Sequence, residues 1–167
     1  AYQDLSFVTQ EPQLGTGHAL LQTAGILERQ SGLVLLLSGD VPLLRRHTLA
    51  DLVEKHRESQ AAATVLSALV ERPYGYGRIV RVRGKISRIV EERDASPAQR
   101  KIREINSGVY VFSLASLFEA LRGLATGNAQ GEYYLTDLIS SYRHRRFGVE
   151  VVVVEDQNEI RGINSRS

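Results

Sequence analysis

Cysteine, methionine and tryptophan are absent from this 167-residue chain, and only 3 of its 21 basic residues are lysine. Without cysteine the chain can form no disulfide framework, cysteine nucleophile, thiol redox centre or Cys-based zinc site. No apolar run approaches the roughly 20 residues of a membrane-spanning helix, and no signal peptide pattern opens the sequence. These absences lead us to expect a soluble, cytoplasmic protein with no membrane partner.

The charge balance argues against a nucleic-acid partner. A sequence pI near 9.1 is compatible with one, but the formal net charge is only +2. Arginine is spread along the chain and interleaved with aspartate and glutamate. The densest basic cluster, Arg143–Arg146, follows an amphipathic segment and suits the C-terminus of a helix. We therefore expect no nucleic acid to bind.

Short apolar segments alternate with helical patterns, which is typical of an α/β protein. The uniformly apolar segment 33–37 predicts a central parallel strand buried on both faces. Further strands are predicted at 5–9, 62–70, 76–82, 85–90, 109–112 and 149–154. Helices are predicted at 16–30, 48–59, 114–124 and 135–142, with a short one after the Ser96-Pro97 cap. With 43% hydrophobic residues, residues 1–167 suffice for one domain with a full core.

The alternation of strand and helix is interrupted in the middle of the chain. Segments 76–82 and 85–90 flank Arg83-Gly84, which predicts a β-hairpin. We expect residues 74–108 to form a small accessory region around this hairpin, within the single domain.

A glycine-rich loop precedes the first predicted helix. Gly15 and Gly17 flank Thr16, so the backbone can approach a flat group closely, and the free amides of a helix start favour a polar or anionic ligand. A plain helix cap with a tight turn is the alternative.

The segment Ser38-Gly39-Asp40 ends the most apolar predicted strand. In open α/β sheets ligands bind beyond the carboxyl ends of strands, and a carboxylate there suits a divalent metal bridging phosphate oxygens. The alternative is an aspartate that caps the next helix.

Three polar points lie beside glycine-rich backbone: Tyr76-Gly77-Arg78, Glu91 at the end of the predicted hairpin, and Asn106-Ser107-Gly108. A carboxylate, an amide and a bare glycine amide are the groups that a sugar's hydroxyls and acetamido group require. Each alone is also compatible with turn chemistry or a solvated charge, so their convergence is the decisive observation.

Several strings of residues together resemble one family. The strings Gln-Leu-Gly-Thr-Gly-His-Ala at 13–19, Gly-Asp-Val-Pro at 39–42 and Asn-Ala-Gln-Gly-Glu-Tyr-Tyr at 128–134 resemble the bacterial N-acetylglucosamine-1-phosphate uridyltransferases. These are the pyrophosphorylase half of a bifunctional enzyme of peptidoglycan precursor synthesis. Gly-Tyr-Gly-Arg-Ile at 75–79, Ile-Val-Glu at 89–91 and Glu-Ile-Asn at 104–106 follow in the family's order, so that the resemblance covers essentially the whole chain.

The resemblance implies a Rossmann-like nucleotidyltransferase fold with a mixed, mainly parallel sheet. It also implies a reaction, in which UTP and N-acetylglucosamine 1-phosphate give UDP-N-acetylglucosamine and pyrophosphate by magnesium-assisted in-line attack. Carried over by position, the nucleotide site would comprise Gln10, Gly15, Thr16, Ser38, Gly39 and Asp40. The sugar site would comprise Gly77, Glu91, Asn106, Tyr134 and Thr136. Asp40, acting catalytically through the metal, and Asn164 would bind Mg²⁺.

Parts of the family pattern are not found in this sequence. The family's opening strand and its Ala-Ala-Gly-x-Gly-Thr-Arg phosphate loop have no counterpart, and no hexapeptide repeat of the acetyltransferase β-helix occurs. We therefore expect an N-terminally truncated domain, whose sheet is completed by its own missing N-terminal segment or by another chain. Acetyltransferase activity is not predicted. The alternatives are a thymidylyl- or guanylyltransferase acting on another sugar 1-phosphate, and a non-catalytic fragment that binds a UDP-sugar.

Overall fold

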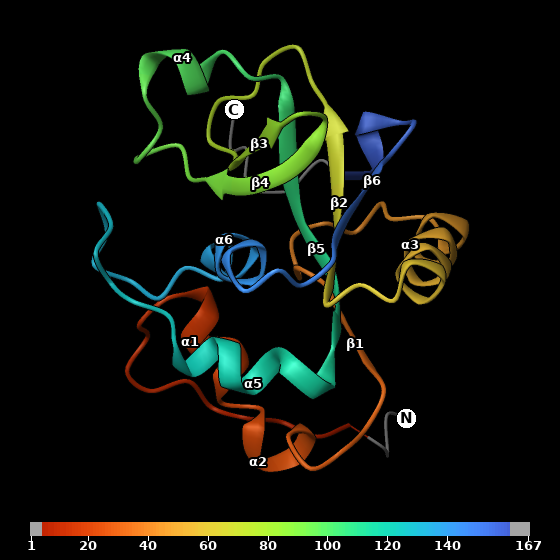
Figure 1. Cartoon of the computed structure of the whole chain (residues 1–167), viewed down its shortest axis with the longest axis vertical. Coiled ribbons are helices and arrows are strands. Elements are labelled where there is room, and N and C mark those ends of the chain that lie inside the picture. The colour runs from red at the N-terminus through yellow and green to blue at the C-terminus, as the bar shows by residue number, and fades with distance from the viewer. Residues whose placement is uncertain (1–4, 161–167) are drawn as a thin grey trace.

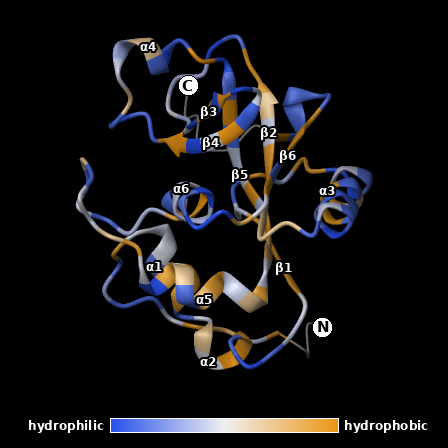
Figure 2. Ribbon diagram, viewed as in Figure 1, coloured by the Kyte–Doolittle hydropathy of each residue, from blue (hydrophilic) through white to orange (hydrophobic). Residues whose placement is uncertain are grey.

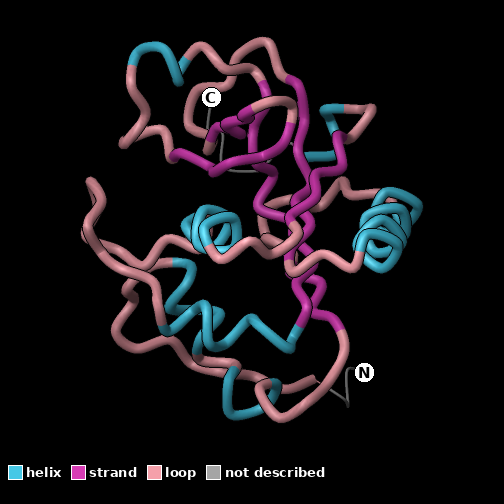
Figure 3. Tube along the Cα trace, in the orientation of Figure 1, coloured by secondary structure: helices cyan, strands magenta, loops and turns pink. Residues whose placement is uncertain are grey.

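The computed structural model describes residues 5–160, which form one sheet with helices on both faces (Figure 1). The strands are β1 (Leu33–Leu36), β2 (Ala63–Leu69), β3 (Arg78–Val82), β4 (Lys85–Val90), β5 (Glu104–Ser113) and β6 (Val149–Val153). The helices are α1 (Thr16–Leu21), α2 (Ala24–Leu27), α3 (Arg46–Ser59), α4 (Pro97–Arg100), α5 (Leu114–Arg122) and α6 (Asp137–His144), with a 3₁₀ turn η1 (Gln157–Ile160). Figure 3 shows how they alternate along the chain.

The sheet is organised around β5, its longest strand. The strand order is β4-β3-β5-β2-β6, and β1 also pairs with β5. Among the described residues only β2 and β6 pair in parallel, and β5 runs antiparallel to β1, β2 and β3. The prediction of a mixed sheet is confirmed, but the prediction that it is mainly parallel is wrong. A run of apolar residues indicates burial without indicating strand direction, which depends on distant partners.

Two local predictions near the N-terminus are also wrong. In the described part of the chain β1 pairs only with β5, and Leu35 is 38% exposed, so this strand is not buried on both faces. Residues 5–9 form no strand, and Phe7 is 85% exposed. A β-strand forms only where a neighbouring strand pairs with its backbone N–H and C=O groups, and residues 5–9 pair with no strand in the described part of the chain.

The predicted helix at 16–30 is two short helices, α1 and α2. The Thr23 hydroxyl donates a hydrogen bond to the carbonyl oxygen of Leu20 at 2.7 Å, between the two helices. Such local bonds compete with the helical ladder, because they engage a carbonyl that the next turn would otherwise use.

The hairpin of β3 and β4 is present as predicted. Arg83 and Gly84 have φ values of 51° and 78°, which are the left-handed values that a two-residue type I′ turn requires. The hairpin belongs to the same sheet as the other strands, but it joins β5 at a single register position, Arg78 opposite Ile105.

The sheet separates two apolar layers, because successive residues of a strand point to opposite faces. Tyr110 and Phe112 of β5 pack on one face with residues of α5 and α6. Val109 and Val111 pack on the other face with Leu52 of α3. Hydrophobic residues follow the strands and the helix surfaces turned towards them (Figure 2). No helix in residues 5–160 combines the length and hydropathy that crossing a bilayer would require.

Candidate functional site

Five predicted ligand residues from separate parts of the chain line one cavity of about 280 Å³, which we term the polar cavity. They come from the start of α1, the segment after β1, the residue after β4, the first part of β5 and the residue before α6. These residues are Thr16, Ser38, Glu91, Asn106 and Thr136. Of the three positions whose convergence the sequence-based hypothesis requires, Glu91 and Asn106 line this cavity and Gly77 does not.

Glu91 contributes the carboxylate of the polar cavity. Its Oε1 atom accepts a hydrogen bond from the Thr136 hydroxyl at 2.9 Å, which fixes the side chain against the start of α6. Burial raises the pKa of Glu91 above its ordinary value, and the charges of Asp137 and Asp94 act in the same direction. The Thr136 bond and the charge of Arg78 oppose this rise. Burial thus disfavours the charged form of Glu91, because the carboxylate loses part of its hydration.

Gly77 and Asn106 lie on either side of the hairpin junction. The Asn106 amide N–H donates to the carbonyl oxygen of Gly77 at 2.9 Å. A Cβ atom at Gly77 would lie 3.4 Å from both carboxylate oxygens of Glu91. The Asn106 side chain donates to the Tyr110 hydroxyl at 2.7 Å and accepts from the Gly108 amide at 3.2 Å. These contacts orient the predicted sugar ligands relative to one another.

The Gly-Thr-Gly loop and the Tyr-Tyr segment form one continuous structure. Gly17 N–H donates to the carbonyl oxygen of Tyr133 at 2.8 Å, and the Thr16 hydroxyl oxygen accepts from Leu135 N–H at 3.1 Å. Gly15 has a φ of 106°, and a Cβ atom there would lie 2.8 Å from the Tyr133 carbonyl oxygen. The glycine is therefore required by both backbone conformation and space.

Gln10 lies behind this loop and is not among the residues that line the polar cavity. Its amide nitrogen donates to the carbonyl oxygen of Gly15 at 2.9 Å and lies 3.1 Å from His18 Nδ1. The structure thus brings the predicted nucleotide ligands Gln10, Gly15 and Thr16 together, with Gln10 supporting the loop from outside the cavity.

The segment after β1 presents a free carboxylate. Ser38 donates a hydrogen bond to the carbonyl oxygen of Gly108 at 3.3 Å and lines the cavity. Gly39 and Asp40 are exposed, and Asp40 makes no hydrogen bond or ion pair with residues 5–160. Asp40 does not cap the next helix, because the N-cap of α3 is Arg45.

The capping acceptor of α3 comes instead from the far end of the chain. Glu159 accepts from the Arg45 amide at 3.1 Å and from the Thr48 hydroxyl at 2.6 Å. Asp40 is therefore left free for a ligand. A hard oxygen donor without a protein partner fits a magnesium ion, which prefers one or two carboxylates together with substrate oxygens. The described residues contain no group of three acidic or histidine ligands, and Asn164, the other predicted ligand, lies outside them.

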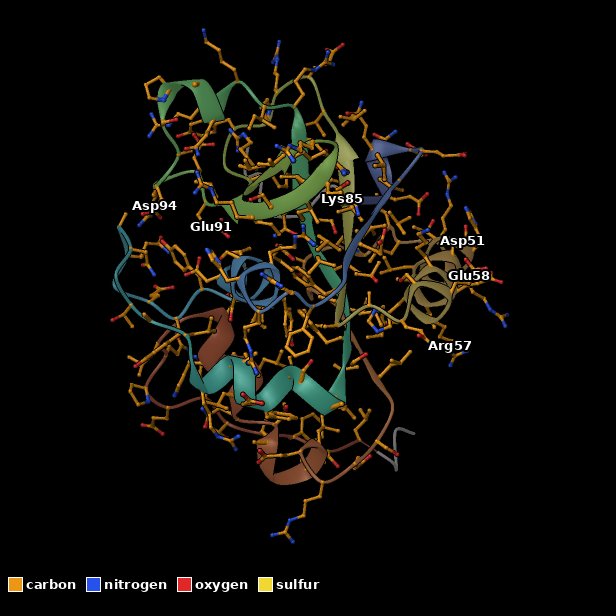
Figure 4. The ribbon with its side chains drawn as sticks, viewed as in Figure 1. Asp51, Arg57, Glu58, Lys85, Glu91 and Asp94 are labelled. Atoms are coloured by element: carbon orange, nitrogen blue, oxygen red, sulfur yellow. The ribbon has the colours of Figure 1, made fainter. Side chains whose placement is uncertain are left out.

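Tyr134 does not line the polar cavity. It lines a second pocket of about 350 Å³ together with Glu91, Asp94 and Asp137. Burial raises the pKa of Tyr134 to about 12, and the charge of Asp94 contributes to the rise. Figure 4 shows Glu91 and Asp94 on the side of the hairpin that faces α6.

The sequence-based prediction of ligand residues omits several residues that line the polar cavity. Five of them are the aliphatic residues Ala19, Leu20, Leu36, Leu37 and Leu135. Gly108 and Tyr110 line it beside Asn106. The φ of Gly108 is 79°, and its preceding Asn-Ser pair is the only local signal that this backbone bends towards a ligand. Tyr110 sits in an apolar strand, where an aromatic residue is expected in the core.

Comparison with known proteins shows which family the chain matches. A family model described as nucleotidyl transferase matches residues 2–156. The chain is 51% identical over 166 residues to the bifunctional protein GlmU of Syntrophotalea carbinolica, covering 99% of this chain and 36% of that protein. It is also 51% identical over 158 residues to the bifunctional protein GlmU of Pelotomaculum thermopropionicum, covering 94% of this chain and 35% of that protein.

The fold is also found among solved structures. A UDP-glucose pyrophosphorylase complexed with UDP-glucose superposes with a TM-score of 0.66 at 19% identity, covering 87% of this chain and 57% of that one. This likeness confirms the predicted nucleotidyltransferase fold. The chain spans about a third of the length of the curated relatives that it matches. From the family match and these relatives, the chain belongs to the nucleotidyl transferase family.

Proposed function

We propose that this chain forms part of an enzyme that transfers a uridylyl group from UTP to N-acetylglucosamine 1-phosphate, giving UDP-N-acetylglucosamine and pyrophosphate. The observation that carries the proposal is the convergence of Thr16, Ser38, Glu91, Asn106 and Thr136 on one cavity. The identity of about half of the residues to the bifunctional GlmU proteins supports the same reaction.

The sugar would bind at the hairpin side of the polar cavity. The Glu91 carboxylate accepts hydrogen bonds from sugar hydroxyls, and the Asn106 side chain serves the acetamido group or a neighbouring hydroxyl. Gly77 leaves the space over the carboxylate open, since a side chain there would meet Glu91. Thr136 positions Glu91 through its hydroxyl. Tyr134 would act from the second pocket, which Glu91 also lines.

The uracil would bind at the loop side. Gly15 and Thr16 form a wall against the Tyr133–Leu135 backbone, where a flat base can lie close to the main chain. Gln10 holds the Gly15 carbonyl in place. Ser38 and Gly39 would follow the nucleotide towards its phosphates.

Asp40 is proposed to hold Mg²⁺, with Asn164 as a second ligand. When bound, the ion supplies charge neutralisation on the phosphate oxygens. A phosphate oxygen of the sugar phosphate forms a bond to the α-phosphorus of UTP, and the bond from that phosphorus to the bridging oxygen breaks, so that pyrophosphate leaves. No covalent intermediate with the protein is required, and the residues of the cavity act by positioning both substrates.

A nucleotide panel tests this proposal. The purified chain is incubated with N-acetylglucosamine 1-phosphate, Mg²⁺ and UTP, TTP or GTP, and pyrophosphate release is measured. We expect UTP to be preferred. Asp40→Ala should lower turnover by about 100-fold or more, as removal of a charge-stabilising group does. Asp51→Ala, which removes an exposed aspartate of α3 (Figure 4), should leave turnover unchanged.

The other outcomes identify the alternatives. A preference for TTP or GTP would assign the chain to a different sugar nucleotidyltransferase. Absence of turnover with all three nucleotides, combined with calorimetric binding of UDP-N-acetylglucosamine, would identify a non-catalytic binding fragment. Equal turnover of the Asp40 variant and the parent at saturating magnesium would remove Asp40 from the metal site.

A further inference from the structure

A third pocket, distinct from the polar cavity and from the pocket of Tyr134, lies between the turn of the hairpin and the C-terminal end of α6. This pocket has a volume of about 570 Å³. Four of its seven lining residues are basic, namely Arg83, Lys85, Arg143 and His144, and none is acidic. We term it the basic pocket. Its two pairs of basic residues come from segments some sixty positions apart in the sequence.

The positive charges of the basic pocket have no partners in the described part of the chain. Arg83, Lys85 and Arg143 form no ion pair there, although Arg145, two residues after Arg143, pairs with Glu119 at 2.6 Å. His144 Nδ1 lies 2.7 Å from the carbonyl oxygen of Ser140. Since a carbonyl oxygen can only accept, Nδ1 carries a proton, and the ring is held at the end of the helix.

The helix dipole explains the placement of only two of the four basic residues. Cations near a helix C-terminus interact favourably with the helix dipole, which explains Arg143 and His144. The dipole gives no reason for Arg83 and Lys85 to lie on the same concave surface. Like charges around one pocket repel, and a bound anion relieves that repulsion.

We propose that the basic pocket binds a compact oligoanion, a phosphate-bearing species with two or more negative charges. Arginine offers a planar set of donors to phosphate oxygens, and the pocket brings two arginines and a lysine together. No phenylalanine, tyrosine or tryptophan lines it, so it lacks the large stacking surfaces on which single-stranded nucleic acids bind. A small anion held by charge fits this lining better than an extended polymer does.

The position of the basic pocket relative to the polar cavity gives a bound anion a structural consequence. β4 begins at Lys85 in the basic pocket and is followed by Glu91 in the polar cavity. α6 follows Thr136 in the polar cavity and ends at His144 in the basic pocket. The anion would therefore join the far ends of the two elements whose near ends are linked by the Thr136–Glu91 hydrogen bond.

Calorimetric titration of the chain with inorganic tripolyphosphate, in EDTA and about 150 mM salt, tests the proposal. The test variant Arg83→Asn/Lys85→Gln/Arg143→Gln removes three positive charges, with asparagine chosen for the left-handed position. The control Arg46→Gln/Lys55→Gln/Arg57→Gln removes three exposed charges from α3. We expect binding to weaken at least about tenfold in the test variant and to change less than about twofold in the control.

Equal weakening in both variants would overturn the proposal, because it would indicate a diffuse charge effect. Unchanged binding in the test variant would also overturn it. A single-stranded oligonucleotide that binds more tightly than tripolyphosphate, and loses affinity in the test variant, would identify a nucleic-acid site instead.

If the test variant does not fold, the proposal can still be tested on the parent chain, by titrating it with tripolyphosphate and recording amide NMR spectra. Tripolyphosphate must then shift the amide resonances of residues 83–87 and 143–144. Resonance shifts confined to residues 15–16 and 38–40 would overturn the proposal that the anion binds the basic pocket, and would place the anion at the proposed transfer site. Anion binding at the basic pocket is therefore tested separately from the transfer reaction.

Discussion

Glu91 is placed under two opposed demands. Binding a sugar requires a carboxylate that accepts hydrogen bonds, whereas burial raises the pKa of this carboxyl and so disfavours its charged form. Because the folded chain holds this proton to higher pH than the unfolded chain does, the folded state binds more protons over the intervening range. The contribution of the Glu91 carboxyl to the free energy of unfolding therefore falls as pH rises through that range. In the proposed function, Glu91 would therefore serve sugar binding at a cost in folding stability.

Glu91→Gln should separate these demands. Glutamine can still accept from Thr136, but it carries no charge to desolvate, so the variant should be more stable than the parent at pH 7. This difference should disappear as pH falls below the ordinary carboxyl range. Affinity for N-acetylglucosamine 1-phosphate should weaken by about tenfold, as expected when a hydrogen bond to a charged group is lost. Thermal unfolding and calorimetry measure the two effects.

Glu58→Gln supplies the control for this experiment, because Glu58 is an exposed glutamate on α3 (Figure 4). It should change neither stability nor affinity. A Glu91→Gln chain that is less stable than the parent at pH 7 would contradict a net desolvation cost at the Glu91 carboxylate.

At the scale of elements, the start of α1 depends on glycine rather than on a capping side chain. Its N-cap is Gly15, which makes no side-chain hydrogen bond and lies against the Tyr133 backbone. The helix start and the segment before α6 therefore hold each other in place. A change that separates them should affect the nucleotide side of the cavity.

Gly15→Ala should destabilise the chain by about 1–3 kcal/mol, because alanine is strained at this φ and its Cβ would meet a backbone carbonyl. UTP binding should weaken in parallel. Gly25→Ala is the matched control, since Gly25 lies within α2 and a Cβ atom there would meet nothing within 4 Å. That control should stabilise the chain by about 0.5–1 kcal/mol. Urea unfolding and calorimetry give both values, and equal effects at the two glycines would argue against the backbone contact.

Local signals predict some elements of this fold well. Arg83-Gly84 between two alternating segments is sufficient for the hairpin. Ser96 with Gln99 three residues later is sufficient for the capping box of α4, in which both reciprocal hydrogen bonds form. The interactions that define these elements are made within a few residues.

Elements whose bounds depend on residues far away in the sequence cannot be predicted from local patterns. α3 begins at Arg46 rather than at Thr48, and its capping carboxylate comes from Glu159, more than a hundred residues away. β5 begins well before residue 109, because Ser107, which resembles a turn residue, is buried and donates to the carbonyl oxygen of Leu66 at 2.7 Å. Family resemblance predicts Glu91, Asn106 and Thr136 as sugar ligands, but their shared cavity depends on long-range pairing.

At the scale of the whole molecule, the sheet is unevenly connected. β2 and β5 pair along most of their length, whereas the strand pairing of β3 with β5 has a single register position, Arg78 opposite Ile105. Arg78 is 1% exposed and forms an ion pair at 2.6 Å with Glu92, which follows β4, so this buried charge contact lies within the hairpin region. Across the junction, Arg81 of β3 forms an ion pair with Glu104 of β5 at 2.6 Å.

Native-state hydrogen exchange should reveal two levels of protection. Amides of β2 and β5 should exchange only on global unfolding, and those of β3 and β4 should exchange through a lower-energy opening, because fewer ladder bonds must break. Arg78→Gln should lower the opening free energy of the hairpin more than that of β2, since it leaves Glu92 without its buried partner. Identical opening free energies in the two regions of the parent chain would contradict this division of the sheet.

The single register position at Arg78 also has an evolutionary consequence. One continuous stretch of chain, from Gly77 to Glu91, carries two predicted sugar ligands, and its strand β3 pairs with β5 at one register position. Sequence drift, or even replacement of this stretch, can alter the shape offered to a sugar without shifting the register of β2, β5 or β6. Sugar preference can thus diversify in one module, while the loop proposed to read the nucleotide is inherited unchanged.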